Sequence, residues 1–241
     1  MGFGREELRR LMDRLVFYGE GAMRDVLPRQ LFFSARDEIL DGREIITSQI
    51  IDRVNLCNQL PRGIAAEPAT RLRHVSRSKS RYFYDLNTYL KSFPAGLRID
   101  YLFGDVTVVP DRPTLVKSRP IVDGNINSIL LNLDKLRHFK LAPDPFPWSQ
   151  KTGRAVWRGG SRGPLRPALI RRHARSSIAD VGQIGEQFEG IPPKSFMSRR
   201  DQMRYRYIIS VEGNDVATNL KWIMASNSLC LMPRPRFETW F

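Results

Sequence analysis

The chain has 241 residues, 41% hydrophobic and 27% charged, a composition that supports one large folded domain or two small ones. No run of about 18 apolar residues occurs, and residues 1–20 are charged throughout, so we expect neither a membrane span nor a signal peptide. Cys57 and Cys230 lie far apart and none of the three histidines joins a cysteine motif, which predicts reduced cytosolic thiols and no zinc site.

The formal charge of +14 is concentrated in the C-terminal part of the chain. Residues 1–150 carry 23 basic and 18 acidic side chains, whereas residues 151–241 carry 16 and 7. Seven arginines lie between Arg154 and Arg175 without one acidic residue. Because the guanidinium fork suits phosphate oxygens, this distribution indicates a polyanionic partner: a nucleotide diphosphate, nucleic acid or an anionic membrane surface. A solvated basic face without a specific ligand is the ordinary alternative.

The N-terminal part is predicted to be mixed helix and strand. Amphipathic helices are expected at 3–20 and 37–57, a basic loop at 61–81, and an aromatic-rich helix at 82–93. Residues 97–109 favour a strand–turn–strand that bends at Gly104-Asp105, and residues 129–139 favour a short helix. The run at 141–153 contains three prolines and is typical of a linker. We therefore predict two domains, residues 1–150 and residues 151–241.

Strands and helices alternate regularly after this linker. Residues 155–157 and 178–181 favour strands, separated by a glycine turn at 159–163 and a helix at 164–173. Further strands are expected at 207–211 and 228–232, with a polar turn and an amphipathic segment between them. This alternation predicts an α/β fold with a parallel, doubly wound sheet.

The strongest local signal is the turn that begins at Trp157-Arg158 and ends at Gly163, followed by Arg166 on the next helix. Its three glycines let the backbone approach a ligand closely, and the helix N-terminus and arginines could neutralise a diphosphate. The turn is neither a P-loop nor G-x-G-x-x-G, so ATP hydrolysis and dinucleotide redox chemistry lose support. An ordinary glycine-rich turn is the alternative reading.

A second polar turn, residues 213–219, opens the next helix. Asn214 or Asp215 is a natural N-cap for that helix, which is the structural interpretation of these side chains. Because the two turns belong to consecutive crossover units of one sheet, we expect them to face the same crevice.

Asp105 follows an apolar run in the N-terminal part and could act as a general base towards a substrate hydroxyl. Three other carboxylates are rivals for this role, and turn formation is the usual explanation for such a residue: Asp100, Asp111 and Asp123. Polar side chains suited to sugar hydroxyls, and hence to an acceptor, are Lys117, Arg119 and Asn127. No Asp-x-Asp occurs, which weakens any enzyme that holds a nucleotide diphosphate through a metal on that motif.

Four segments together resemble the family 90 glycosyltransferases, most closely the bacterial lipopolysaccharide-biosynthesis branch: RIDYLFGDVTVVPDRPTLVKSRPI, ILLNLDKLRHF, VWRGGSRGPLRPALI and residues 205–241. The resemblance implies a GT-B-like fold, in which two Rossmann-like halves face a cleft. It also implies inverting transfer of a sugar from a nucleotide diphosphate sugar, usually UDP-linked, to lipopolysaccharide or another glycan, without an obligatory metal or other cofactor. Family members continue past Trp240-Phe241, so a truncated, incomplete C-terminal half is expected.

The resemblance places the catalytic aspartate at Asp105 and the donor-diphosphate arginine at Arg166. The other donor-binding candidates come from the two turns: Arg158, Gly159, Ser161, Arg162, Gly213, Asn214, Asp215, Thr218 and Asn219. The turn around Ser161 is shifted by one residue relative to the animal members of the family. Animal members also carry an arginine where Asn219 stands, so part of the phosphate clamp must differ.

We expect a cytoplasmic protein, peripheral at the inner membrane, because the excess of basic residues and the basic loop at 71–81 favour an anionic surface. Nucleic acid is not expected as a partner. Two alternatives remain at this point: a basic, non-catalytic module that binds nucleic acid or anionic lipid, and an inactive truncated transferase.

Overall fold

The computed structural model describes residues 5–42, 47–61, 70–141 and 143–240, which form two compact units. The N-terminal unit comprises the chain up to Leu136 together with Trp240, and the C-terminal unit comprises Arg137–Thr239. The boundary between the units therefore follows Leu136, whereas the composition of the sequence predicts it at residue 150. The proline-rich run belongs to the C-terminal unit because the buried carboxylate of Asp144 accepts hydrogen bonds from Lys151 Nζ (2.6 Å) and from Asn227 N (2.9 Å).

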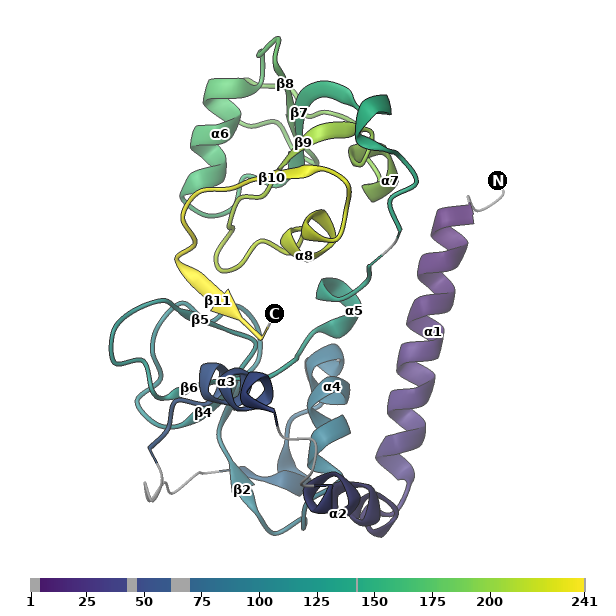
Figure 1. The fold of residues 1–241 in the computed structure, drawn as a ribbon, viewed down its shortest axis with the longest axis vertical. Helices are drawn as coiled ribbons and strands as arrows, with labels where there is room; N and C mark the ends of the chain where they lie inside the picture. The colour runs from purple at the N-terminus through teal and green to yellow at the C-terminus, as the bar shows by residue number, and fades with distance from the viewer. Residues whose placement is uncertain (1–4, 43–46, 62–69, 142, 241) are drawn as a thin grey trace. The chain divides into compact units, whose positions relative to one another are not determined.

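Helices dominate the first part of the N-terminal unit (Figure 1): α1 Arg5–Val26, η1 Arg29–Phe32, α2 Phe33–Asp41, α3 Ser48–Cys57, η3 Leu72–His74 and α4 Ser80–Leu90. The single helix predicted over 37–57 is instead two helices. Gly42 ends α2, where its N–H donates to the carbonyl of Glu38 (3.1 Å). Residues 62–69 of the predicted loop at 61–81 lie outside the described residues, and its described part holds one short strand, η3 and the start of α4.

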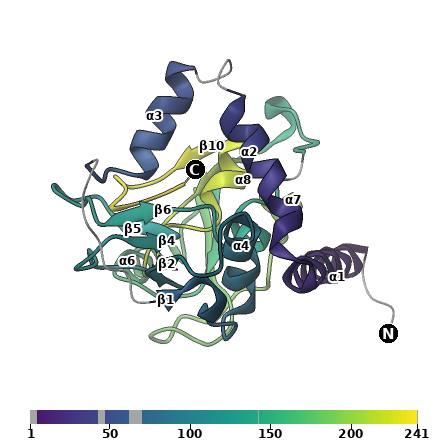
Figure 2. The ribbon, with the colours of Figure 1, turned by 90° about the horizontal axis from the view of Figure 1, so that it is seen from below.

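The strands of this unit are short: β1 Thr70–Arg71, β2 Arg98–Ile99, β3 Tyr101–Leu102, β4 Thr114–Val116, β5 Ser118–Pro120 and β6 Ser128–Leu130. β1 and β2 are antiparallel, whereas β3, β4 and β6 form a parallel sheet in the order β3-β4-β6. Figure 2 shows β4 and β6 side by side. The strand–turn–strand prediction for 97–109 is wrong in its second strand, because β3 pairs with β4 and the chain after Gly104 is irregular. The helix predicted at 129–139 is wrong in its first half, where β6 ends at Leu130 and residues 131–134 are irregular; only α5 Lys135–His138 is helical.

Helix α4 packs the main core of the N-terminal unit. Its apolar face and the neighbouring segments contribute the buried residues Leu72, Val75, Tyr82, Phe83, Leu86, Leu90 and Leu133. The aromatic-rich helix predicted at 82–93 is therefore present, beginning two residues earlier and ending before Pro94. This core holds the parallel sheet from which Asp105 and Lys117 extend.

The C-terminal unit is built on a four-stranded sheet, all parallel, as predicted. The strands are β7 Thr152–Gly159, β8 Ala179–Gln183, β9 Tyr205–Ile209 and β10 Leu229–Leu231, in the order β10-β9-β7-β8. The remaining elements are η4 Trp148–Gln150, α6 Leu165–His173, α7 Arg199–Gln202, α8 Leu220–Met224 and β11 Phe237–Thr239. Because β8 and β9 lie on opposite sides of β7, the topology reverses between β7 and β9, where open α/β sheets bind ligands.

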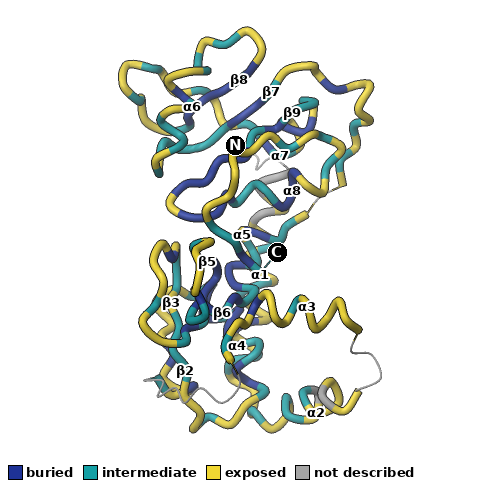
Figure 3. Tube along the Cα trace, turned by 60° about the vertical axis from the view of Figure 1, so that its left-hand side comes forward, coloured by how far each residue is buried: buried dark blue, intermediate teal, exposed yellow. Residues whose placement is uncertain are grey.

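Side chains pack on both faces of the sheet at its central strand β7, and the buried residues of β7 and β8 are dark blue in Figure 3. On one face, Val156 and Ile208 pack with Met203, Trp222 and Ile223. On the other, α6 covers the sheet through Ile170, which packs with Trp157, Ala179 and Val181. Neighbouring residues of β7 thus serve opposite faces, which is why its apolar residues run together in the sequence.

Candidate active site

The two polar turns of the C-terminal unit lie in contact at the carboxyl ends of β7 and β9. Gly163 has a positive φ of 83°, and a Cβ atom on it would overlap the carbonyl group of Gly213. Any side chain at position 163 would push the turns apart, and only glycine adopts this backbone conformation freely. The two turns, which the sequence predicts to face one crevice, are in direct contact where the sheet topology reverses.

Arg166, in the first turn of α6, links the two turns. Its Nε and Nη2 donate to the carbonyl oxygen of Val211 (3.2 and 3.1 Å), and its Nη1 donates to that of Gly160 (3.4 Å). A Cβ on Gly213 would lie 3.2 Å from this guanidinium. A half-buried cation is thus held where the backbone of both turns converges, beside the N-terminus of α6.

Arg158 is held on a face of the sheet by an acidic residue that sequence reasoning missed. Its Nη2 donates to the carboxylate of Asp180 on β8 (2.8 Å), whose other oxygen accepts from Lys194 Nζ (2.7 Å). These two cations outweigh partial burial and lower the pKa of Asp180 to about 2. Arg158 therefore has an acidic partner within the unit, which it shares with Lys194. The sequence signal for Asp180 was a carboxylate inside a short apolar strand.

In the N-terminal unit, Asp105 and Lys117 meet at the carboxyl edge of the parallel sheet. Asp105 follows β3 after Gly104, which has a positive φ of 112°, and Lys117 directly follows β4. Lys117 Nζ donates to Asp105 Oδ1 at 3.0 Å. The lysine side chain is 2% exposed and the carboxylate 35%, so a buried cation orients a carboxylate that solvent can reach.

Comparison with known proteins identifies the family. Residues 124–241 match the model of Glycosyl transferase family 90. Over 242 aligned residues the chain is 42% identical to the O-glucosyltransferase LpsA of Dichelobacter nodosus, covering 98% of this chain and 76% of that protein. The chain belongs to glycosyltransferase family 90. The resemblance predicted from the sequence is thereby confirmed, and an enzyme family replaces the non-catalytic basic module as the interpretation of this chain.

The remaining donor-binding candidates of the first turn differ in their burial and contacts. Gly159 lies against the ring of Trp157, since a Cβ there would be 2.7 Å from a ring carbon. Ser161 is half-buried, and Arg162 is exposed. Both residues therefore lie on the loop that leads into the junction at Gly163.

The second turn differs from the prediction in its helix start. α8 begins at Leu220 after Asn219, so neither Asn214 nor Asp215 is its N-cap, and Asn219 makes no side-chain capping bond. Asn219 instead bridges the end of β9: its Nδ2 donates to the carbonyl of Ile209 (3.1 Å), and its Oδ1 accepts from Ser210 (3.1 Å). Asn214 is exposed, Asp215 is buried and Thr218 is half-buried. The turn is longer, and the helix shorter, than the sequence indicated.

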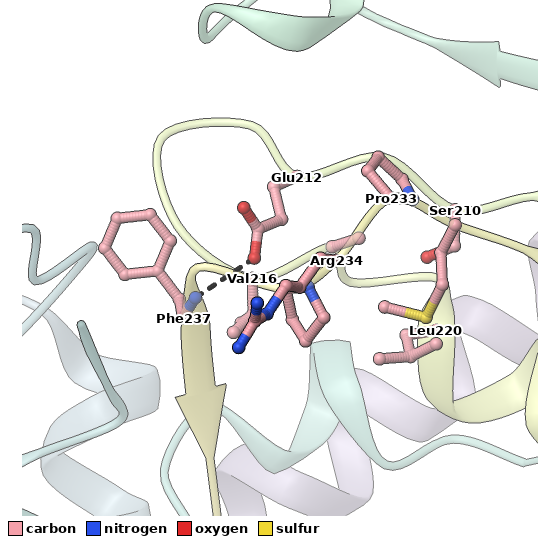
Figure 4. A pocket seen from close by; sticks show the side chains of 10 residues that line it. Ser210, Glu212, Val216, Leu220, Pro233, Arg234 and Phe237 are labelled. Carbon is pink, nitrogen blue, oxygen red and sulfur yellow. Dashed lines mark hydrogen bonds between the residues drawn. The ribbon is translucent and has the colours of Figure 1, made fainter. Parts of the chain in front are cut away.

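Glu212 is a second residue whose role the sequence did not reveal. Its buried carboxylate accepts from the backbone N–H groups of Arg236 (2.9 Å) and Phe237 (3.1 Å) and from Arg236 Nε (3.1 Å). Glu212 lines a small cavity of about 20 Å³ together with Ser210, Leu220 and Pro233 (Figure 4). Glu212 thus ties the segment after β10 to the carboxyl end of β9.

The other two acceptor candidates, Arg119 and Asn127, also have internal partners. The buried guanidinium of Arg119 donates to the carbonyls of Ser128 (2.9 Å) and Leu56 (2.7 Å). Asn127 Nδ2 donates to the carbonyl of Pro110 (2.9 Å). Arg119 thus links β5 to β6 and α3, and Asn127 links the residue before β6 to Pro110.

Among the rival carboxylates, Asp100 is paired with Arg112 (3.7 Å), whereas Asp111 and Asp123 are exposed in turns. In the part of the chain that the structure describes, no group of three or more His, Cys, Asp or Glu side chains could hold a metal ion. No described helix is long and apolar enough to cross a membrane.

Proposed function

We propose that this family 90 glycosyltransferase moves a sugar from a nucleotide diphosphate sugar, UDP-linked, to lipopolysaccharide or another glycan with inversion at the anomeric carbon. The observation that carries the donor class is the junction of the two turns, where Gly163 meets Gly213 and Arg166 is held between them. A GT-B-like arrangement of the two units and the absence of an obligatory metal are parts of the same proposal.

The donor diphosphate is assigned to this junction on chemical grounds. Arg166 donates to neutral carbonyl oxygens there, and a diphosphate oxygen is a stronger acceptor for the same N–H groups because it is charged. The N-terminus of α6 adds a positive electrostatic potential at the same place. Arg158 is held by Asp180 at 2.8 Å, so we assign it the role of supporting the turn rather than binding phosphate.

In the reaction, Asp105 takes the proton of an acceptor hydroxyl while that oxygen forms a bond to the anomeric carbon. The bond from the anomeric carbon to the diphosphate oxygen breaks from the opposite side, so the configuration inverts and UDP leaves with the electron pair. Arg166 and the backbone N–H groups of the turns stabilise the charge that develops on UDP. Lys117 keeps the carboxylate of Asp105 in a single orientation.

UDP binding to wild type and to Arg166→Ala tests the donor site. Loss of a charge-assisted hydrogen bond should weaken binding by about 1.5–3 kcal/mol. Arg172→Ala is the matched control, because Arg172 is an exposed arginine on the same helix. Equal UDP affinity in the three proteins would remove Arg166 from the site.

A surface of arginines stacked on aromatic rings supports association with an anionic membrane surface, from which the acceptor would be reached. The guanidinium carbons of Arg200 and Arg204 lie 5.6 and 4.6 Å from the ring centre of Phe146. Arg206 lies 5.5 Å from that of the exposed Trp148. Binding to anionic vesicles should fall as salt rises, and Trp148→Ala should weaken it. Unchanged binding in that variant would place the contact elsewhere.

A further inference from the structure

The helix α1, the purple helix in Figure 1, exposes a stripe of apolar side chains along its length. The exposed fraction ranges from 46% for Leu11 to 82% for Val26. The apolar residues are Leu8, Leu11, Met12, Leu15, Val16, Met23 and Val26. Burying contiguous apolar surface is favourable, and soluble proteins that expose this much of it in one patch use it for interaction.

The opposite side of α1 is anchored to α4, so the helix cannot turn its stripe inward. Gly21 is buried, and a Cβ atom there would lie 2.6 Å from the ring of Tyr84. The rings of Phe17 and Tyr18 meet that of Tyr84 edge-on, with centroids 6.4 and 5.9 Å apart. The orientation of the exposed stripe is therefore set by the packing of the N-terminal unit.

The spacing of the stripe is that of a coiled-coil seam. Its central positions are separated alternately by four and three residues: Leu8, Met12, Leu15, Gly19, Ala22 and Val26. A heptad repeat of this kind keeps one seam facing a partner helix. All six residues are exposed, and a Cβ on Gly19 would meet no atom within 4 Å, so the seam has room for side chains of another helix.

The seam is complementary to itself when a second copy runs antiparallel about Phe17. Each larger side chain then faces a smaller one: Leu8 faces Val26, Met12 faces Ala22, and Leu15 faces Gly19. A parallel pairing would set Gly19 against Gly19 and leave a gap. An interface that matches its own copy under a two-fold axis is what a symmetric dimer requires.

We propose that α1 pairs antiparallel with α1 of a second copy of this chain and forms a symmetric dimer. A protein helix is favoured over a lipid surface by two features of α1. The helix carries five arginines and five acidic residues, so its net charge offers no attraction to anionic lipid. Its aromatic side chains, Phe17 and Tyr18, pack on α4 rather than in the stripe.

Sedimentation or light scattering of the whole chain tests the proposal at tens of micromolar protein. Wild type should form dimers, and Leu15→Glu should raise the dimer dissociation constant about tenfold or more, because it places a charge at the centre of the seam. Ile178→Glu is the matched control, since Ile178 is also an exposed apolar residue and lies in the C-terminal unit. It should dimerise like wild type.

Cysteine cross-linking tests the direction of the helices. Met12→Cys alone should not form a covalent dimer, because the two copies of position 12 would lie about 15 Å apart along the antiparallel pair. A mixture of Met12→Cys and Ala22→Cys proteins should form one, since these positions face each other. The wild-type protein, treated in the same way, is the control for cross-linking through the native cysteines Cys57 and Cys230.

Three results would overturn the proposal. A wild-type chain that stays monomeric at these concentrations rules out the dimer. Covalent dimers of Met12→Cys alone indicate a parallel pairing. A monomeric chain whose binding to neutral or anionic vesicles is lost in Leu15→Glu and kept in Ile178→Glu would show that the stripe contacts lipid.

Discussion

At the scale of single residues, the buried cation of Lys117 orients the solvent-accessible carboxylate of Asp105, which we propose as the general base. Asp105→Asn should lower turnover on the order of 100-fold or more and leave UDP affinity unchanged, because the carboxylate acts on the acceptor. Asp100→Asn and Asp111→Asn are the comparisons, measured as kcat on a common acceptor preparation. If either of them gives the larger loss, the base is assigned to the wrong carboxylate.

The pairing of Lys117 with Asp105 is measurable without substrate. Unfolding of wild type, Asp105→Asn, Lys117→Met and the double variant should give a coupling energy on the order of 1 kcal/mol. A larger value is not expected, because Asp105 keeps about a third of its surface in solvent, which screens the pair. Additive losses would indicate that Lys117 acts through other contacts.

Asp85 on α4 predicts a pH-dependent contribution to stability. Burial is the main cause that raises its pKa to about 6, although the Lys135 N–H donates to it (2.8 Å). The neutral carboxyl is thus favoured in the folded state, and its contribution is present below about pH 4 and lost as pH rises through 6. Asp85→Asn should therefore be more stable than wild type at pH 7.5, by on the order of 2 kcal/mol.

Urea unfolding at pH 4 and pH 7.5 measures this difference, which should shrink at the lower pH. Asp123→Asn, at an exposed turn, is the control and should match wild type at both values. A variant that is less stable than wild type at pH 7.5 would contradict the assignment of Asp85 as a buried charge.

At the scale of elements, the contact of the two turns depends on a single glycine. Gly163→Ala should destabilise the chain by about 1–3 kcal/mol and weaken UDP binding, because its Cβ forces the backbone of the second turn away and its φ is strained. Gly160→Ala is the matched control three residues earlier, where a Cβ meets no atom within 4 Å. Thermal unfolding and UDP titration of both variants compare them. Identical behaviour would mean that the turns are not held by this contact.

At the scale of the whole molecule, ligand binding should protect one unit more than the other. The donor candidates all lie in the C-terminal unit, between Arg158 and Asn219. Saturating UDP should therefore slow hydrogen exchange in β7, β9 and the two turns and leave α4 unchanged. At about 100 times its dissociation constant, UDP should add about 2.7 kcal/mol to the free energy of unfolding. Equal protection of both units would place the nucleotide differently.

Local sequence was sufficient where strands and helices are long and punctuated by glycine. In residues 155–232 the parallel sheet, the turn at 159–163 and the helix that follows were predicted, because apolar runs and glycines act over a few residues. In the N-terminal unit the strands have two or three residues. The sequence predicts the start of a helix where β6 lies. A strand of three residues is too short to show an alternating apolar pattern, and its pairing with β4 is a contact between segments distant in sequence.

The chain by itself determined the family, the α/β class and the position of both turns, because these follow from motifs and local propensity. Only the tertiary structure decided which charges meet. Arg158 pairs with Asp180, Lys117 pairs with Asp105, and Arg166 donates to the carbonyl of Val211, 45 residues further along the chain. Such pairs depend on strand order and register, which bring distant residues together, and no local pattern of residues carries that information.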